Sequence, residues 1–186
     1  NSYVYREFGQ VKADEDILSL NFLSYNPESR VYPLLLGFVS TNFRRDIDLR
    51  YLIGAGATFK VLNSEKNRLT FSLSSEFEQT NFGSADFNVS AYDGNKSIET
   101  IRGTLWVSGR YELFEKKLIL THQSYVQPSL EKRDNYRWQA DLGLELPVFD
   151  FLNFKVNYLQ TFESIVIQNQ KREDVFLTFG FTVKSY

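Results

Sequence analysis

Apolar and polar residues alternate with a period of two along most of the chain, and no window sustains the period of an amphipathic helix. Because successive side chains of a strand point to opposite faces, this alternation predicts strands with one apolar and one polar face. The segment 136–148 is the clearest case, since its charged residues all share one phase. We predict about ten strands, near 2–11, 16–25, 31–42, 46–62, 68–80, 97–114, 117–128, 133–148, 151–162 and 173–184.

The links between these strands alternate in length. Tight links rich in turn-forming residues, such as 26–29 and 63–67, alternate with longer or more charged ones, such as 12–16, 42–46 and 81–96. Short turns on one rim and longer loops on the other are typical of outer-membrane barrels. No linker or low-complexity run interrupts the series, so we expect a single domain over residues 1–186.

Alternation alone also fits a soluble, lipocalin-like barrel that binds a ligand, in which the apolar face points inward. The aromatic content favours lipid: 17 Phe, 11 Tyr and 2 Trp are more bulk than a small closed interior can hold. Strands of 11 or more residues can also cross a bilayer when tilted. The sequence therefore predicts an all-β, antiparallel, up-and-down transmembrane β-barrel in the bacterial outer membrane, with the lipid bilayer as its main partner.

The cost of exposing charge to lipid fixes the register of each strand. A Lys or Arg facing lipid at the bilayer midplane costs roughly 2–4 kcal/mol, so the charged phase must face the lumen. The residues expected in the lumen are Asp48, Arg50, Lys60, Glu76, Glu78, Arg102, Arg110, Glu112, Arg137, Asp141, Glu145 and Lys155. Those expected to face lipid or to form the interfacial girdles are Tyr51, Phe59, Tyr111, Tyr136, Trp138, Leu142, Leu144, Phe154, Tyr158, Phe179 and Phe181.

A lumen that holds both signs of charge favours internal ion pairs, with a narrow diffusion pore as the alternative. The 21 basic and 23 acidic residues give a net charge of −2, which disfavours a nucleic-acid partner. The absence of cysteine excludes disulfides and thiolate chemistry. The chain starts at Asn1 without an apolar leader, so we expect that a secretion signal has been removed.

Catalytic chemistry has one candidate, the single histidine, His122, with Ser124 on the same strand face. Side chains at i and i+2 lie roughly 6–7 Å apart along a strand, too far for a direct hydrogen bond. We therefore expect no enzyme and no cofactor or metal site; an outer-membrane lipid hydrolase using His122 is the alternative. The longest loop offers Phe82, Phe87 and Tyr92 as a candidate external contact surface, unless these rings pack on the rim of their own barrel.

From Phe43 onward, the order of short motifs resembles a bacterial family, the salt-induced outer-membrane proteins (YdiY-like), also described as domain of unknown function 481. The motifs are Asp46–Arg50, Gly54–Gly56, Arg68–Leu69, Tyr111–Phe114, Asp134–Arg137, Leu144–Pro147 and Glu173–Val175. The resemblance implies an outer-membrane barrel of undefined, structural or subunit role. It also implies assembly by the barrel assembly machinery and contact with other envelope proteins. The resemblance further implies a family barrel of about 12 strands, so we expect that this chain either lacks an N-terminal hairpin or is a ten-stranded relative.

Overall fold

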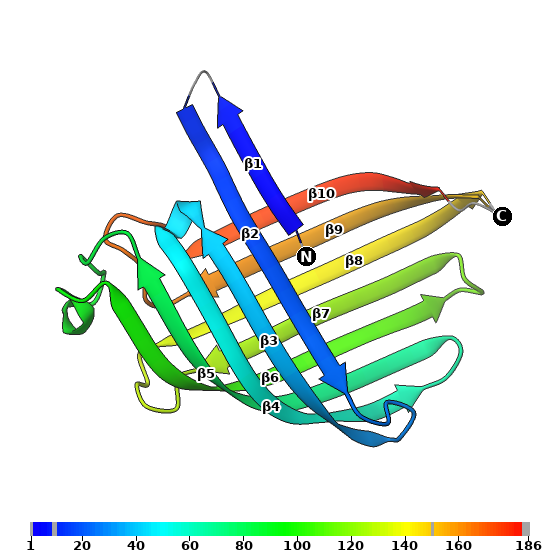
Figure 1. Ribbon diagram of the computed structural model, residues 1–186. Helices are drawn as coiled ribbons and strands as arrows, with labels where there is room; N and C mark the ends of the chain where they lie inside the picture. Colours follow the sequence, from blue (N-terminus) through cyan, green and yellow to red (C-terminus); the bar gives the residue numbers. More distant parts are fainter. Residues whose placement is uncertain (1, 9–10, 150, 184–186) are drawn as a thin grey trace.

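The computed structural model describes residues 2–8, 11–149 and 151–183. These residues form one antiparallel sheet of ten strands, each paired with its neighbours in sequence (Figure 1). This order confirms the predicted all-β, up-and-down topology. No helix among the described residues is long and apolar enough to span a membrane. The strands are β1 Ser2–Phe8, β2 Val11–Ser24, β3 Val31–Asn42, β4 Ile47–Asn63, β5 Asn67–Phe82, β6 Ser97–Leu113, β7 Leu118–Pro128, β8 Tyr136–Phe149, β9 Leu152–Glu163 and β10 Glu173–Val183, with two 3₁₀ turns, η1 Phe43–Arg45 and η2 Ser90–Tyr92.

The main departure from the predicted strand bounds lies in β2. The acidic run 12–16 reads as a loop in the sequence, but β2 begins at Val11 and this run belongs to the strand. Its backbone pairs with β1, from Phe8 opposite Val11 to Ser2 opposite Leu18. Backbone pairing in a hairpin needs no apolar alternation, which is why the pattern missed this half of the strand.

The sheet curls into a barrel-like shell (Figure 1). Two glycines of β4 lie against the backbone of β5. A Cβ atom on Gly54 would lie 2.3 Å from the carbonyl oxygen of Ser75, and one on Gly56 would lie 2.1 Å from that of Leu73. Both contacts are with backbone atoms, so only glycine fits here.

The pairings among the described residues do not close the shell into a ring. β1 is paired with β2 only as far as Leu18, and β3 takes up the pairing from Leu18 onward. Within the described ranges, residues 20–24 of β2 pair with β3, and β10 pairs with β9.

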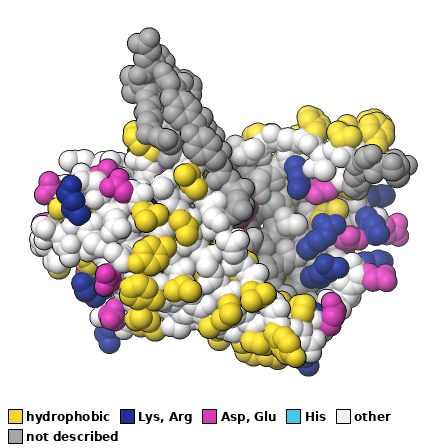
Figure 2. All heavy atoms as spheres, in the orientation of Figure 1, with side chains coloured by type: hydrophobic (Ala, Val, Ile, Leu, Met, Phe, Trp, Pro, Cys, Tyr) yellow, Lys and Arg dark blue, Asp and Glu magenta, His cyan; other side chains and the backbone are white. Residues whose placement is uncertain are grey.

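Burial in this sheet is inverted relative to a water-soluble protein. Among the described residues, the largest fully buried side chains include Glu76, Glu78 and Asn153. Large apolar side chains are the exposed ones, for example Ile53 at 67 % and Phe181 at 68 % of their surface. Figure 2 shows hydrophobic side chains spread over the outer face, with charged ones gathered toward the two ends.

One end of the shell is covered by its own long loops. The loop between β5 and β6 and the loop between β9 and β10 meet through a bridge between Phe87 and Ile167. Their apolar side chains form the only buried hydrophobic cluster found in the described part of the chain, which we call the loop cap. The loop cap consists of Ile47, Phe82, Phe87, Tyr92, Ile98, Ile165 and Ile167.

Candidate functional site: a buried ion network beneath the loop cap

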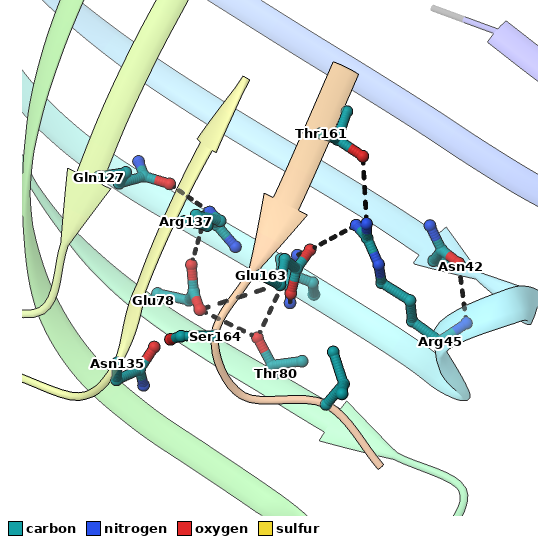
Figure 3. Close-up of polar contacts among 12 residues, drawn as sticks. Asn42, Arg45, Glu78, Thr80, Gln127, Asn135, Arg137, Thr161, Glu163 and Ser164 are labelled. Carbon is teal, nitrogen blue, oxygen red and sulfur yellow. Dashed lines mark hydrogen bonds and ion pairs between the residues drawn. The ribbon is translucent and has the colours of Figure 1, made fainter. Parts of the chain in front are cut away.

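Seven charged side chains meet inside the shell, directly beneath the loop cap. They come from β4, β5, β6, β8, β9, β10 and the turn η1, so the group joins strands on opposite sides of the curled sheet. Figure 3 shows several of them pointing toward one another. We call this group the ion network: Arg45, Arg50, Glu78, Arg102, Arg137, Glu163 and Asp174.

Glu78 of β5 is the centre of the ion network and is 1 % exposed. Arg102 of β6 donates to both of its carboxylate oxygens, each at 2.9 Å. Arg137 of β8 donates to Oε2 at 2.5 Å, and Nε of Arg50 lies 4.0 Å from Oε1. Bidentate and charge-assisted bonds of this kind hold a planar guanidinium in one orientation.

Glu163, at the end of β9, is a second centre. Arg50 of β4 donates to its two carboxylate oxygens at 2.8 and 2.7 Å, and Arg45 donates to Oε1 at 3.0 Å. Arg45 also reaches Asp174 of β10 at 2.8 Å and Thr161 at 3.1 Å. Since Glu163 is far from Arg45 and Arg50 along the chain, these contacts tie the first half of the sheet to its last two strands.

Arg45 is placed by the turn η1. The side chain of Asn42 caps this turn by accepting a hydrogen bond from the backbone N–H of Arg45 at 3.0 Å (Figure 3). Asp46 then adopts a left-handed backbone with φ of 55°, which returns the chain to β4. The cap and the left-handed residue turn the Arg45 side chain back into the shell, where it is 6 % exposed.

Neutral polar side chains satisfy much of the remaining hydrogen-bonding capacity. Gln127 accepts from Nε of Arg137 at 2.5 Å and donates to Thr104 at 2.6 Å. Asn135 accepts from Arg102 at 2.9 Å. Buried polar groups that are satisfied in this way rigidify their surroundings.

The ion network and the loop cap leave almost no free space between them. The intervening cavity measures about 10 Å³ and is lined by Glu78, Arg102, Arg137, Ile98 and Ile165, among others. A single water molecule needs at least roughly 10–15 Å³. The arrangement therefore suits a structural seal, because neither a substrate nor a chain of water molecules fits through it.

The loop cap carries a titratable group of its own. The hydroxyl of Tyr92 donates to Asp134 at 3.2 Å. Burial, together with the negative charge of Asp134, raises the pKa of Tyr92 to about 12. Lys132 lies over the Tyr92 ring at 4.6 Å, so the same residue also ties the loop between β7 and β8 to the loop cap.

Four of the twelve residues expected in the lumen come together in the ion network: Arg50, Glu78, Arg102 and Arg137. Glu76 is buried beside it and accepts from Thr104 at 2.7 Å. The others lie outside it. Arg110 with Glu112 and Glu145 with Lys155 form ion pairs nearer the short-turn end, Lys60 lies over the ring of Tyr32, and Asp141 is half-buried in a separate cavity.

Asp48 departs from the prediction made for it. The pairing of β4 with β5 shifts register between Ile47 and Leu49, and this β-bulge leaves Asp48 exposed. Ile47 instead turns inward and joins the loop cap. A bulge inserts one residue into one strand, so the phase counted from Arg50 no longer holds on its far side.

The residues expected in the lipid-facing and girdle set lie on or near the outer face in varied settings. Leu142, Leu144, Phe179, Phe181, Phe59 and Tyr136 are exposed. The remainder are half-buried against neighbours: Trp138 stacks on Phe162, Phe154 packs on Phe179 and Phe181, Tyr51 bonds Gln79, Tyr158 bonds Gln160, and Tyr111 contacts His122.

The prediction that the longest loop offers an external contact surface was wrong. Phe82, Phe87 and Tyr92 are 4 %, 4 % and 5 % exposed, because all three rings pack into the loop cap. Phe87 meets Phe82 edge-on at a centroid distance of 5.0 Å. The structure confirms the alternative, in which these aromatic rings pack on the rim of their own shell.

His122 lies on the outer face rather than in a polar interior. A Cβ atom on the outward-facing Gly109 would touch its Nε2 atom, and its ring stacks on Tyr111. Its Nε2 atom lies 3.3 Å from the Tyr111 hydroxyl. No sequence pattern points to this pair, because Tyr111 and His122 are brought together through the register of β6 and β7.

Among the described residues, no cluster of three or more His, Asp or Glu side chains could hold a metal ion.

Comparison with known proteins identified one protein family. No curated protein matched the chain. The model of one protein family matches residues 3–184, which is nearly the whole sequence. The match does not address the salt-induced or YdiY-like description. The chain belongs to the family described as protein of unknown function, DUF481.

Proposed function

We propose that this protein is a non-enzymatic β-barrel of the bacterial outer membrane, with a structural role or as a subunit of an envelope assembly, whose interior is sealed at the loop end. The single observation that carries the proposal is the inversion of burial. Carboxylates such as Glu76 and Glu78 are 1 % exposed while Leu, Ile and Phe side chains cover the outside. Exposed apolar surface on this scale marks a surface built for an apolar surrounding.

The alternation of β8 shows how systematic this inversion is. On its outer phase, Leu142, Leu144 and Leu146 are 45 %, 42 % and 42 % exposed. On its inner phase, Arg137 is buried within the ion network. A soluble barrel that carries a ligand needs the opposite arrangement, with the apolar phase inside. The soluble alternative therefore has little support from this strand.

The seal favours a wall protein over a diffusion pore. Passage along the shell would have to break the bonds of Glu78 to Arg102 and Arg137, and then displace the loop cap. Removing one partner from a buried ion pair typically costs about 3–5 kcal/mol. We expect no steady conductance in planar bilayers.

Location is tested by site-directed spin labelling, because the chain contains no cysteine. Leu144→Cys places a label on the outer face and Ser72→Cys places one on the inner face. In phospholipid vesicles, the label at 144 should collide more often with oxygen and less often with a water-soluble nickel chelate than the label at 72. Equal exposure of both labels to the chelate, or a chain that stays in solution without detergent, would contradict the proposal.

A further inference from the structure

A polar cavity lies inside the shell, nearer the short-turn end than the ion network. It measures about 430 Å³ and is lined by residues of β5, β6, β7, β8 and β9. Figure 2 shows basic and acidic side chains gathered at the end of the shell that carries the short turns. Volumes of roughly 300 Å³ and above are typical of sites for small molecules. We call this space the short-turn cavity.

The floor of the short-turn cavity consists of two neighbouring rows of inward-facing side chains, set side by side by the strand pairing. The first row, from β5 to β9, is Arg68, Arg110, Thr121, Gly143 and Asn157. The second row, from β5 to β8, is Thr70, Ser108, Gln123 and Asp141. Because Ser108, Thr121 and Gly143 are small, they leave open the space between the two arginines and Asp141.

The two arginines of the first row stand directly opposite each other. Arg68 of β5 pairs with Arg110 of β6, and like charges in direct cross-strand register repel. Arg110 donates to Glu112 at 3.1 Å, but Nζ of Lys116 lies 3.8 Å from the other carboxylate oxygen of Glu112. No hydrogen bond or ion pair joins the exposed Arg68 side chain to another described residue. Two cations therefore share one carboxylate, and Arg68 has no counter-charge.

The other side of the short-turn cavity carries the opposite charge. Asp141 of β8 is half-buried, and its carboxylate makes no hydrogen bond or ion pair with another described residue. Asp141 is two strands away from Arg110 and three from Arg68, which places their backbones about 10–14 Å apart along the sheet. The carboxamides of Gln123 and Asn157, beside Asp141, also lack a partner among the described residues.

We propose that the short-turn cavity binds a short peptide with free ends, whose terminal carboxylate meets Arg68 and Arg110 and whose amino group meets Asp141. A guanidinium group matches a carboxylate through paired N–H donors. An extended peptide rises about 3.3 Å per residue, so three residues bridge a span of about 10 Å. The free carboxamides can bond to the peptide groups between the two ends. A ligand that carries only negative charge would leave Asp141 unpaired.

This inference goes beyond the proposed function, because the short-turn cavity needs only the curled sheet. On the proposed membrane location it faces the periplasm, since outer-membrane barrels keep their short turns on that side. The ion network and the loop cap close the opposite end of the shell. The short-turn cavity therefore holds a peptide without passing it across the membrane.

Calorimetric titration of the protein in detergent micelles with trialanine, which has a free ammonium and a free carboxylate, tests the proposal. We expect one saturable site. Trialanine amide lacks the carboxylate and N-acetyl-trialanine lacks the ammonium, so each should bind about tenfold more weakly through the loss of one charge-assisted contact. Trialanine that shows no saturable binding, or three peptides that bind equally, would overturn the proposal.

Inorganic phosphate tests whether negative charge alone is enough. At equal ionic strength, phosphate should leave the affinity for trialanine nearly unchanged, because it offers nothing to Asp141 or to the free carboxamides. Phosphate that displaces trialanine effectively would reveal a simple anion site and would overturn the peptide assignment.

Two substitutions assign the ends of the peptide. In Arg68→Gln, trialanine and its amide should bind nearly equally, because the charge that distinguishes them has been removed. In Asp141→Asn, trialanine and its N-acetyl form should bind nearly equally for the same reason. Lys117→Gln and Glu115→Gln, in the exposed turn between β6 and β7, are the charge-matched controls and should leave every affinity unchanged.

The comparison of the three peptides on the unchanged protein keeps the proposal testable even where a variant fails to fold. A folded Arg68→Gln protein that retains the full preference for the free carboxylate would overturn the assigned orientation. Trialanine that does not bind, to a protein whose spin labels confirm insertion, would overturn this inference while leaving the proposed function intact. Saturable binding to a chain that stays in solution without detergent would do the reverse.

Discussion

Glu78 and Glu145 both belong to the inward-facing side of their strands, yet their surroundings differ. Glu78 is 1 % exposed and is bound by Arg102 and Arg137 beneath the loop cap. Glu145 lies nearer the short-turn end and faces Lys155 at 3.7 Å, with the Lys155 side chain 52 % exposed. The phase of a residue decides which face it occupies. Its position along the strand decides whether its charge is buried in an ion pair that stabilises the fold.

The largest effect should come from the centre of the ion network. Glu78→Ala leaves Arg102 and Arg137 buried without their carboxylate, and we expect the unfolding free energy to fall by about 3–5 kcal/mol. Thermal unfolding in detergent, followed by circular dichroism, measures this. A loss under 1 kcal/mol would show that the ion network does not stabilise the fold.

The loop cap should come next. Phe87→Ala removes a ring that contacts Phe82 and Tyr92, and we expect a loss of about 3 kcal/mol, at the low end for such a change because the loop can partly collapse. Hydrogen exchange of the loop amides should rise with it. The exposed Phe114→Ala, in the turn between β6 and β7, is the control and should leave the loop amides unchanged.

Alkali should weaken the loop cap before it affects the short-turn end. Since the pKa of Tyr92 is raised to about 12, the folded form keeps its proton where the unfolded chain, near its ordinary value of 10, has lost it. The stabilisation is complete below pH 10 and is lost as the pH rises toward 12. Tyr92→Phe should flatten this part of the pH profile, and an unchanged profile would contradict the assignment.

The smallest effect should come from the ion pairs of the short-turn end. Glu145→Gln removes a contact with a half-exposed lysine, and we expect a change below about 1 kcal/mol that vanishes at high salt. The same thermal unfolding experiment, run beside Glu78→Ala, measures the contrast directly. Losses of similar size in the two variants would erase the distinction between the two ends.

Much of the fold could be predicted because one period governs most strands. β8 shows this best, since its alternation places Arg137 inside and Leu142 outside without any knowledge of its neighbours. The pattern failed where something other than phase decides the outcome. A bulge resets the phase at Asp48, and on β3 an apolar inner face replaces the polar one.

The candidate site was only half visible in the sequence for a related reason. Arg50 and Glu78 were expected inside, but Arg45 lies in a link and is turned inward by η1 and the Asn42 cap. Glu163 falls at the very end of its strand, where phase gives little information. Which carboxylate meets which arginine depends on how the sheet curls, and no short-range pattern records that.

The contacts of Arg45 with Glu163 and Asp174 also bear on how the molecule is made. Their positions in the sequence differ by 118 and 129 residues, so these bonds can form only after the last two strands have arrived. Contacts between such distant positions form slowly during folding. An unfinished shell would leave Arg45 without Glu163 and Asp174, the two carboxylates that pair with it. On the proposed membrane location, the ion network therefore acts as a check on completion, because only a chain with its last two strands supplies both carboxylates that pair with Arg45.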